Sequence, residues 1–106
     1  MSVARFDVYT NPDAGERKLV PYLLDVQNDF LRAMDTRVVI PLWSASAFRM
    51  RIRDLNPELT IDQNTVVMDT ASVGAIPATD LRRPVKNLAS QQIDIMNALD
   101  ALFGSY

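Results

Sequence analysis

Apolar and polar residues alternate in short runs along the first eighty positions, a pattern typical of β-strands with one buried face. The runs are residues 3–10, 19–27, 37–43, 59–61, 65–70 and 71–80. Turn-forming residues stand at Asn11-Pro-Asp-Ala-Gly15 and at Asp62-Gln-Asn64, and the second group predicts a hairpin. Pro21 and Pro41 cannot donate to a strand ladder, so they indicate an edge, a bend or a bulge.

The apolar period changes near the C-terminus, where Leu88, Ile95, Leu99 and Leu102 recur at helical spacing. We expect one amphipathic helix there, with Leu99 at the middle of its buried stripe. Its start is capped by Asn87 or Ser90 and its end lies at Gly104. Strands first and a single helix last, without alternation of the two, predict an α+β, mainly β fold: a small antiparallel barrel with a C-terminal helix.

The chain has 106 residues, of which 48% are hydrophobic, so we expect one domain spanning residues 1–106. Cysteine and histidine are both absent. Their absence excludes disulfide scaffolds, thiolate metal sites and catalysis by Ser-His or Cys-His pairs. We therefore expect no metal and no cofactor.

The net charge is −2 and the sequence pI is about 4.9, which argues against broad neutralisation of nucleic-acid phosphates. Residues 1–53 nevertheless hold eight Lys or Arg against six Asp or Glu, while residues 54–106 hold three against seven. The N-terminus has charges within its first seven residues, and no apolar run approaches the ~18 residues of a membrane span. We expect a cytoplasmic protein with no membrane partner and no direct nucleic-acid binding.

Three groups of side chains are candidates for chemistry. Asp25, Asp29 and Asp35 could form a carboxylate pair or chelate a hard cation, but a structural role at strand ends is favoured. Residues 45–55 fit either a strand or a helical turn; as a strand, they would place Arg49, Arg51 and Arg53 on one face suited to phosphate, although a solvated face is favoured. Trp43 is expected in the core or at a dimer interface.

Two phrases resemble the CcdB toxin family: Asp25-Val-Gln-Asn-Asp29 and Arg37-Val-Val-Ile-Pro-Leu42. Met68-Asp-Thr-Ala-Ser-Val73 and the predicted helix from Asp94 to Phe103 are also similar, so the resemblance covers nearly the whole chain. It implies a toxin of a plasmid or chromosomal type II toxin–antitoxin system, with an SH3-like barrel of the CcdB/MazF type. It further implies a homodimer that poisons DNA gyrase without being an enzyme, and a cognate CcdA-like antitoxin that neutralises it.

The resemblance also implies which residues bind the gyrase A subunit. They are Phe30 and Leu31 after the first phrase, Asp100 on the helix, and the tail Phe103, Gly104, Ser105 and Tyr106. The family has tryptophan where this chain has Gly104, and asparagine where it has Asp100. Tyr106 is then the one aromatic side chain beyond the helix that could stack on an arginine of the target.

Two other functions stay open at this point. One is a MazF-like ribonuclease toxin on the same barrel, since fold alone does not determine function. Such a ribonuclease would use Arg49 or Arg51 with Thr70. Alternatively, a CcdB-shaped protein could bind antitoxin after losing gyrase poisoning. Gly104 and Asp100 are the residues that support this third reading.

Overall fold

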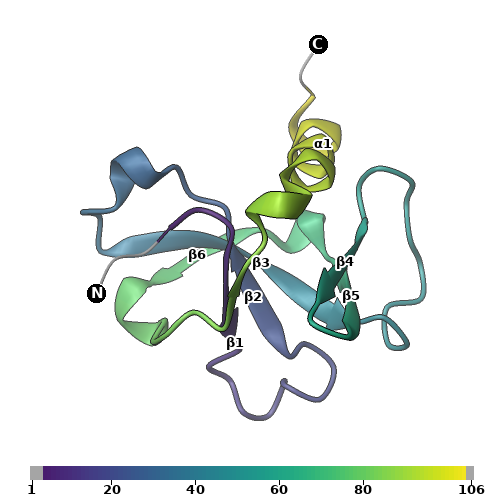
Figure 1. The fold of residues 1–106 in the computed structure, drawn as a ribbon, viewed down its shortest axis with the longest axis horizontal. Coiled ribbons are helices and arrows are strands. Elements are labelled where there is room, and N and C mark those ends of the chain that lie inside the picture. The colour runs from purple at the N-terminus through teal and green to yellow at the C-terminus, as the bar shows by residue number, and fades with distance from the viewer. Residues whose placement is uncertain (1–3, 105–106) are drawn as a thin grey trace.

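A computed structural model describes residues 4–104. Its strands are short and its helix lies near the C-terminus (Figure 1). The strands are β1 (Asp7–Thr10), β2 (Tyr22–Asp25), β3 (Thr36–Ser44), β4 (Glu58–Ile61), β5 (Asn64–Met68), β6 (Gly74–Pro77) and β7 (Lys86–Asn87), and the helix is α1 (Gln92–Phe103). Single 3-10 turns are η1 (Asp29–Leu31), η2 (Thr70–Ser72), η3 (Ala78–Asp80) and η4 (Ala89–Gln91).

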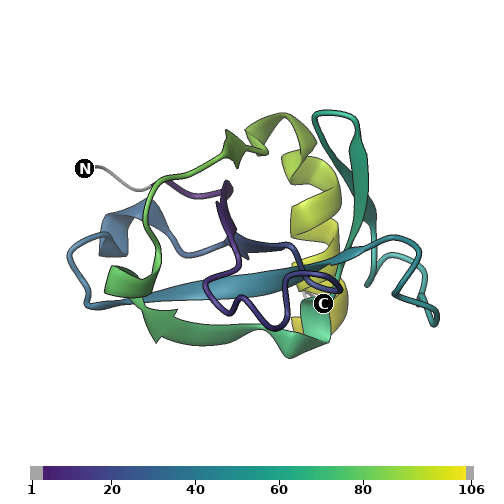
Figure 2. The same cartoon turned by 90° about the horizontal axis from the view of Figure 1, so that it is seen from below.

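All strand pairs are antiparallel, in the order β4-β5-β3-β2-β1-β7. The nine-residue β3 is long enough to pair with β6 through its first half and with β5 through its last residues. The sheet curls into a nearly closed barrel, as Figures 1 and 2 show from two sides. The predicted mainly β, antiparallel barrel with a C-terminal helix is therefore confirmed.

The main core lies inside this barrel and is closed by α1. Its fully buried members include Val8, Leu24, Ile40 and Leu42 from the first three strands. From the helix, Ile95 and Ala98 are buried, while Leu99 is only partly buried. The centre of the buried stripe is thus Ile95 and not Leu99.

A second, smaller apolar cluster lies on the other face of the same strands. Tyr9, Leu23, Val39 and Leu81 form it, and Ile76 packs against it. Side chains that alternate along β1, β2 and β3 therefore bury both faces of the sheet, which accounts for the nearly continuous apolar sequence of β3.

The structure corrects several boundaries. The first strand begins at Asp7 and not before, and Thr70 belongs to η2 instead of β5. The α-helix begins at Gln92, and the expected cap by Asn87 or Ser90 is wrong: the N-cap position is Gln91, whose side chain makes no capping hydrogen bond. Asn87 Oδ1 instead accepts the N–H of Ala89 at 2.9 Å, just before η4. The predicted hairpin at Asp62–Asn64 is confirmed by the pairing of β4 with β5.

Across residues 4–104, no helix combines the length and apolarity that crossing a membrane requires.

Candidate functional site

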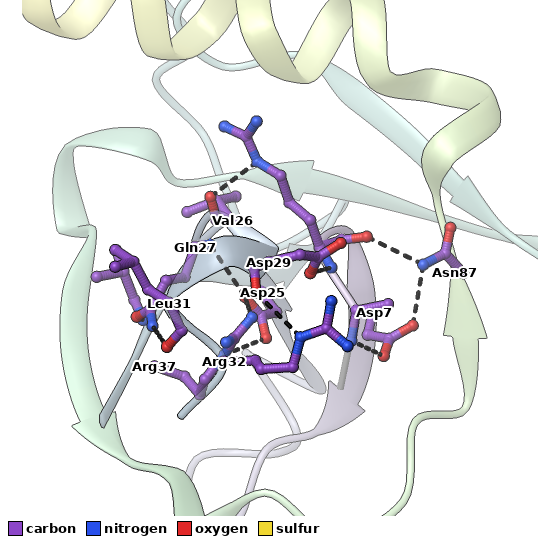
Figure 3. A network of polar contacts seen from close by, with 12 residues as sticks. Asp7, Asp25, Val26, Gln27, Asp29, Leu31, Arg32, Arg37 and Asn87 are labelled. Atoms are coloured by element: carbon purple, nitrogen blue, oxygen red, sulfur yellow. Dashed lines mark hydrogen bonds and ion pairs between the residues drawn. The ribbon is translucent and has the colours of Figure 1, made fainter. Parts of the chain in front are cut away.

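A buried ion pair joins two of the phrases that the sequence singled out (Figure 3). Arg37 donates from Nε to Asp25 Oδ2 at 2.8 Å and from Nη2 to Asp25 Oδ1 at 2.9 Å. Asp25 Oδ1 also accepts the backbone N–H of Gln27 at 3.0 Å. Burial raises the pKa of Asp25, and the hydrogen bonds from Arg37 and Gln27 partly offset that rise.

Asp29, which is also in the first phrase, has a backbone partner as well. Its Oδ1 accepts the N–H of Arg5 at 2.6 Å, which ties the start of η1 to the chain before β1. Among the described residues, no group of acidic side chains is arranged to hold a metal ion. The hydrogen bonds to the backbone N–H groups of Gln27 and Arg5 confirm the structural interpretation of Asp25 and Asp29, and Asp35 is exposed.

Gln27 positions η1, a role that the sequence analysis missed. Its Oε1 accepts the N–H of Val38 at 2.9 Å, and its Nε2 donates to the carbonyl of Leu31 at 3.1 Å. Asn28 Oδ1 accepts the N–H of Phe30 at 2.9 Å and caps the turn. The phrase from Asp25 to Asp29 thus anchors one turn of chain against β3, as Figure 3 shows for its labelled members.

This anchored turn presents apolar side chains to the outside. Phe30 is 90% exposed, and Leu31 and Met34 are also exposed. We call Phe30, Leu31 and Met34 the η1 surface. Three exposed apolar side chains so close together in the chain form the kind of apolar patch that marks interaction sites.

The end of α1 forms a second exposed surface. Phe103 is 71% exposed, and Asp100 lies one turn before it on the solvent side. The N–H of Gly104 donates to the carbonyl of Asp100 at 2.8 Å, and Gly104 has φ of 75°, a left-handed conformation that favours glycine. We call Asp100, Phe103 and Gly104 the helix-end surface.

The structure does not bring these two surfaces together within one chain. Figure 1 shows η1 and the C-terminal end of α1 at separate points of the molecule. Ser105 and Tyr106, the other predicted tail residues, lie outside the described residues. Ile93, at the start of α1, is 74% exposed and adds an apolar side chain to the outer face of the helix.

Trp43 is occupied by contacts within the chain. Its Nε1 donates to Asp69 Oδ2 at 3.1 Å, and its ring meets Phe48 edge to face at a centroid distance of 5.5 Å. Trp43 is partly buried. Trp43 belongs to neither apolar cluster, so the core is not its observed place, and a dimer interface stays a prediction.

The arginine triplet is not a strand face. Residues 45–57 form a loop, in which Arg51 pairs with Glu58 and donates from Nη2 to the carbonyl of Ala45 at 2.8 Å. Thr70, the hydroxyl considered for ribonuclease chemistry, is fully buried and donates to the carbonyl of Leu55 at 2.5 Å. The strand reading of this segment is wrong, and Thr70 is not accessible to a substrate.

The polar network and η1 are built from the sequence phrases that resemble the CcdB family, and a comparison with family models decides the point. The model described as CcdB protein matches residues 5–104. This chain belongs to the CcdB family. The match covers β1 through the end of α1, so it confirms the resemblance seen in the sequence. CcdB proteins are toxins of toxin–antitoxin systems.

Proposed function

We propose that this CcdB-family chain binds the A subunit of DNA gyrase as a cytoplasmic homodimer, and that a cognate CcdA-like antitoxin neutralises it. The observation that carries the proposal is the helix-end surface. Phe103 lies 71% exposed at the last turn of α1, directly before a left-handed Gly104. The family places gyrase contacts at this position of the chain.

Exposed aromatic side chains support a role in binding. Interface energy concentrates in a few aromatic or arginine anchors, and both Phe103 and Phe30 are exposed on ordered elements. In the proposed mechanism the chain performs no chemistry of its own. It binds gyrase more tightly when the DNA is cleaved, and this difference in affinity holds the enzyme in that state.

A homodimer would bring two copies of the helix-end surface to one target. Ile93 and Phe103 leave apolar area uncovered on the outer face of α1. Two-fold symmetry would present two helix ends together, and paired contacts raise the effective affinity for one target. Light scattering is expected to give the mass of two chains at micromolar concentration, and a mass of one chain would contradict this part of the proposal.

The test is calorimetric binding to a purified gyrase A fragment. We expect the wild-type chain to bind, and Phe103→Ala and Phe30→Ala each to weaken binding about tenfold or more. Truncation after Phe103 and Tyr106→Ala are expected to weaken it as well, the second by about 1–3 kcal/mol, since Tyr106 would supply the aromatic stacking. Met50→Ala is the matched control, because Met50 is 85% exposed on the separate 45–57 loop.

Growth assays separate the remaining outcomes. Expression without antitoxin is expected to arrest growth in cells with sensitive gyrase. Absence of gyrase binding with growth arrest and cleaved RNA would contradict the proposal in favour of a ribonuclease. Absence of both binding and arrest, with antitoxin binding retained, would identify a partner protein that no longer poisons gyrase.

A further inference from the structure

A surface pocket of about 520 Å³ lies between the loop that follows β1 and residues 79–83. Three of its side chains are arginines, Arg17, Arg82 and Arg83. The hydroxyl residues Thr10 and Thr79 also line it, as does one carboxylate, Asp80. This basic pocket is unexpected in an acidic chain, and it shares no residue with the η1 surface or the helix-end surface.

Within residues 4–104, the arginines of the basic pocket form no ion pair. Ion pairs within residues 4–104 join Arg37 to Asp25, Arg51 to Glu58 and Lys86 to Asp62, and none of them includes a residue of the pocket. Arginine stays protonated at all ordinary pH values, so three positive charges face one opening. Asp80 offsets one of these charges, so the lining keeps a net positive charge that favours an anion.

The backbone around the pocket is anchored. Leu81 is buried in the second apolar cluster, and the N–H of Val85 donates to the carbonyl of Val8 at 2.8 Å. Residues 82–84, which include Pro84, therefore span a short gap between two fixed points. On the opposite wall, Arg17 donates from Nε to the carbonyl of Asn11, which holds its guanidinium close to the loop.

We propose that the basic pocket binds a ligand that carries phosphoryl groups. The planar guanidinium donates two parallel hydrogen bonds, which match phosphate oxygens, and the threonine hydroxyls can donate to the remaining ones. The volume lies in the range of small-ligand sites and exceeds what one phosphate fills. A ligand with two or more linked phosphoryl groups therefore fits best, and pyrophosphate is its smallest probe.

In the test, the full chain is titrated separately with pyrophosphate, inorganic phosphate and citrate. Calorimetry measures the affinity for each anion, and amide NMR locates the residues that respond. We expect pyrophosphate to bind more tightly than phosphate, with shifts confined to residues 9–17 and 79–83. Arg82→Gln and Arg83→Gln are each expected to weaken pyrophosphate binding about tenfold, since each removes a charge-assisted contact. Asp80→Asn is expected to tighten it several-fold, because it removes the one negative charge of the pocket.

Two control variants make the same charge changes elsewhere. Arg49→Gln and Asp54→Asn alter exposed residues of the 45–57 loop and are expected to leave affinity unchanged. An equal loss in Arg49→Gln would overturn the proposal by showing a general charge effect. Failure of pyrophosphate to bind at millimolar concentration would overturn it too, and equal affinity for citrate would overturn the assignment to phosphoryl groups.

Discussion

Arg37 donates to both carboxylate oxygens of Asp25, and the two side chains are at most 1% exposed. Asp25 ends β2 and lies opposite Val39, so the pair fixes β2 against β3 immediately before η1. One buried ion pair therefore connects the barrel wall to the turn that presents Phe30.

Breaking this pair is expected to destabilise the fold strongly. Arg37→Met leaves the Asp25 carboxylate buried without its partner, and the free energy of unfolding should fall by about 3–5 kcal/mol in urea denaturation. The double variant Asp25→Leu with Arg37→Met removes both charges and should recover part of that loss. A double variant less stable than Arg37→Met alone would show that the pair is not the source of the effect.

The burial of Tyr9 leads us to expect that the free energy of unfolding falls in alkali. Burial, together with the nearby carboxylates of Asp7 and Asp25, raises the pKa of Tyr9 from 10.0 to about 12. The folded state thus holds the phenol proton more tightly than the unfolded state. The resulting stability is full below pH 10 and is lost as the pH rises from about 10 to 12.

Tyr9→Phe is the test of this pH dependence. The Tyr9 hydroxyl is buried without a hydrogen-bond partner among the described residues, so its removal should cost little at pH 7. Chemical denaturation at several pH values should show a smaller alkaline loss in Tyr9→Phe than in the wild type. Tyr22→Phe, which removes another hydroxyl, should keep the wild-type loss.

Gln27→Leu is expected to loosen η1. The substitution removes the bonds to Val38 and Leu31, and amide exchange at Val38 should accelerate because its acceptor is lost. If Phe30 contacts gyrase as proposed, affinity should fall about tenfold while the barrel stays folded. Gln63→Leu, at the exposed hairpin turn, should change neither property, and an unchanged exchange rate in Gln27→Leu would contradict the positioning role.

The burial of the helix side chains predicts which substitution in α1 destabilises the fold more. Ile95 is fully buried, whereas Leu99 is partly exposed. Ile95→Ala should lower the free energy of unfolding by about 2–5 kcal/mol through the cavity it leaves, and Leu99→Ala should cost less. Thermal melts followed by circular dichroism measure both, and a larger loss for Leu99→Ala would mean that the helix packs through a different face.

Much of the fold could be predicted because short-range patterns determine it. Alternation located β1 through β6, and the 3.6-residue period located α1. The helix start was misplaced because Leu88 is buried and fits the helical spacing, although it lies in an irregular segment before η4. Burial alone does not distinguish a helical residue from a loop residue that packs on the same core.

The site was less predictable, because its contacts join distant segments. The exposure of Phe30 depends on Gln27, whose partners lie on β3 and at the end of η1. The alternating arginines at 49–53 suggested a strand, yet Arg51 bonds to the carbonyl of Ala45 and pairs with Glu58 in a loop. Neither arrangement is visible in a sequence pattern, since each depends on the tertiary fold.

The position of β3 has a consequence for how the molecule could be divided. Val39 is paired with both Asp25 of β2 and Gly74 of β6, and Leu42 is paired with both Tyr22 of β2 and Met68 of β5. The 45–57 loop separates β1, β2 and β3 from the later strands along the chain. A chain cut in this loop would yield two fragments, the first of which offers β3 as a template for the strands of the second. The barrel is therefore suited to reassembly from two separately expressed halves.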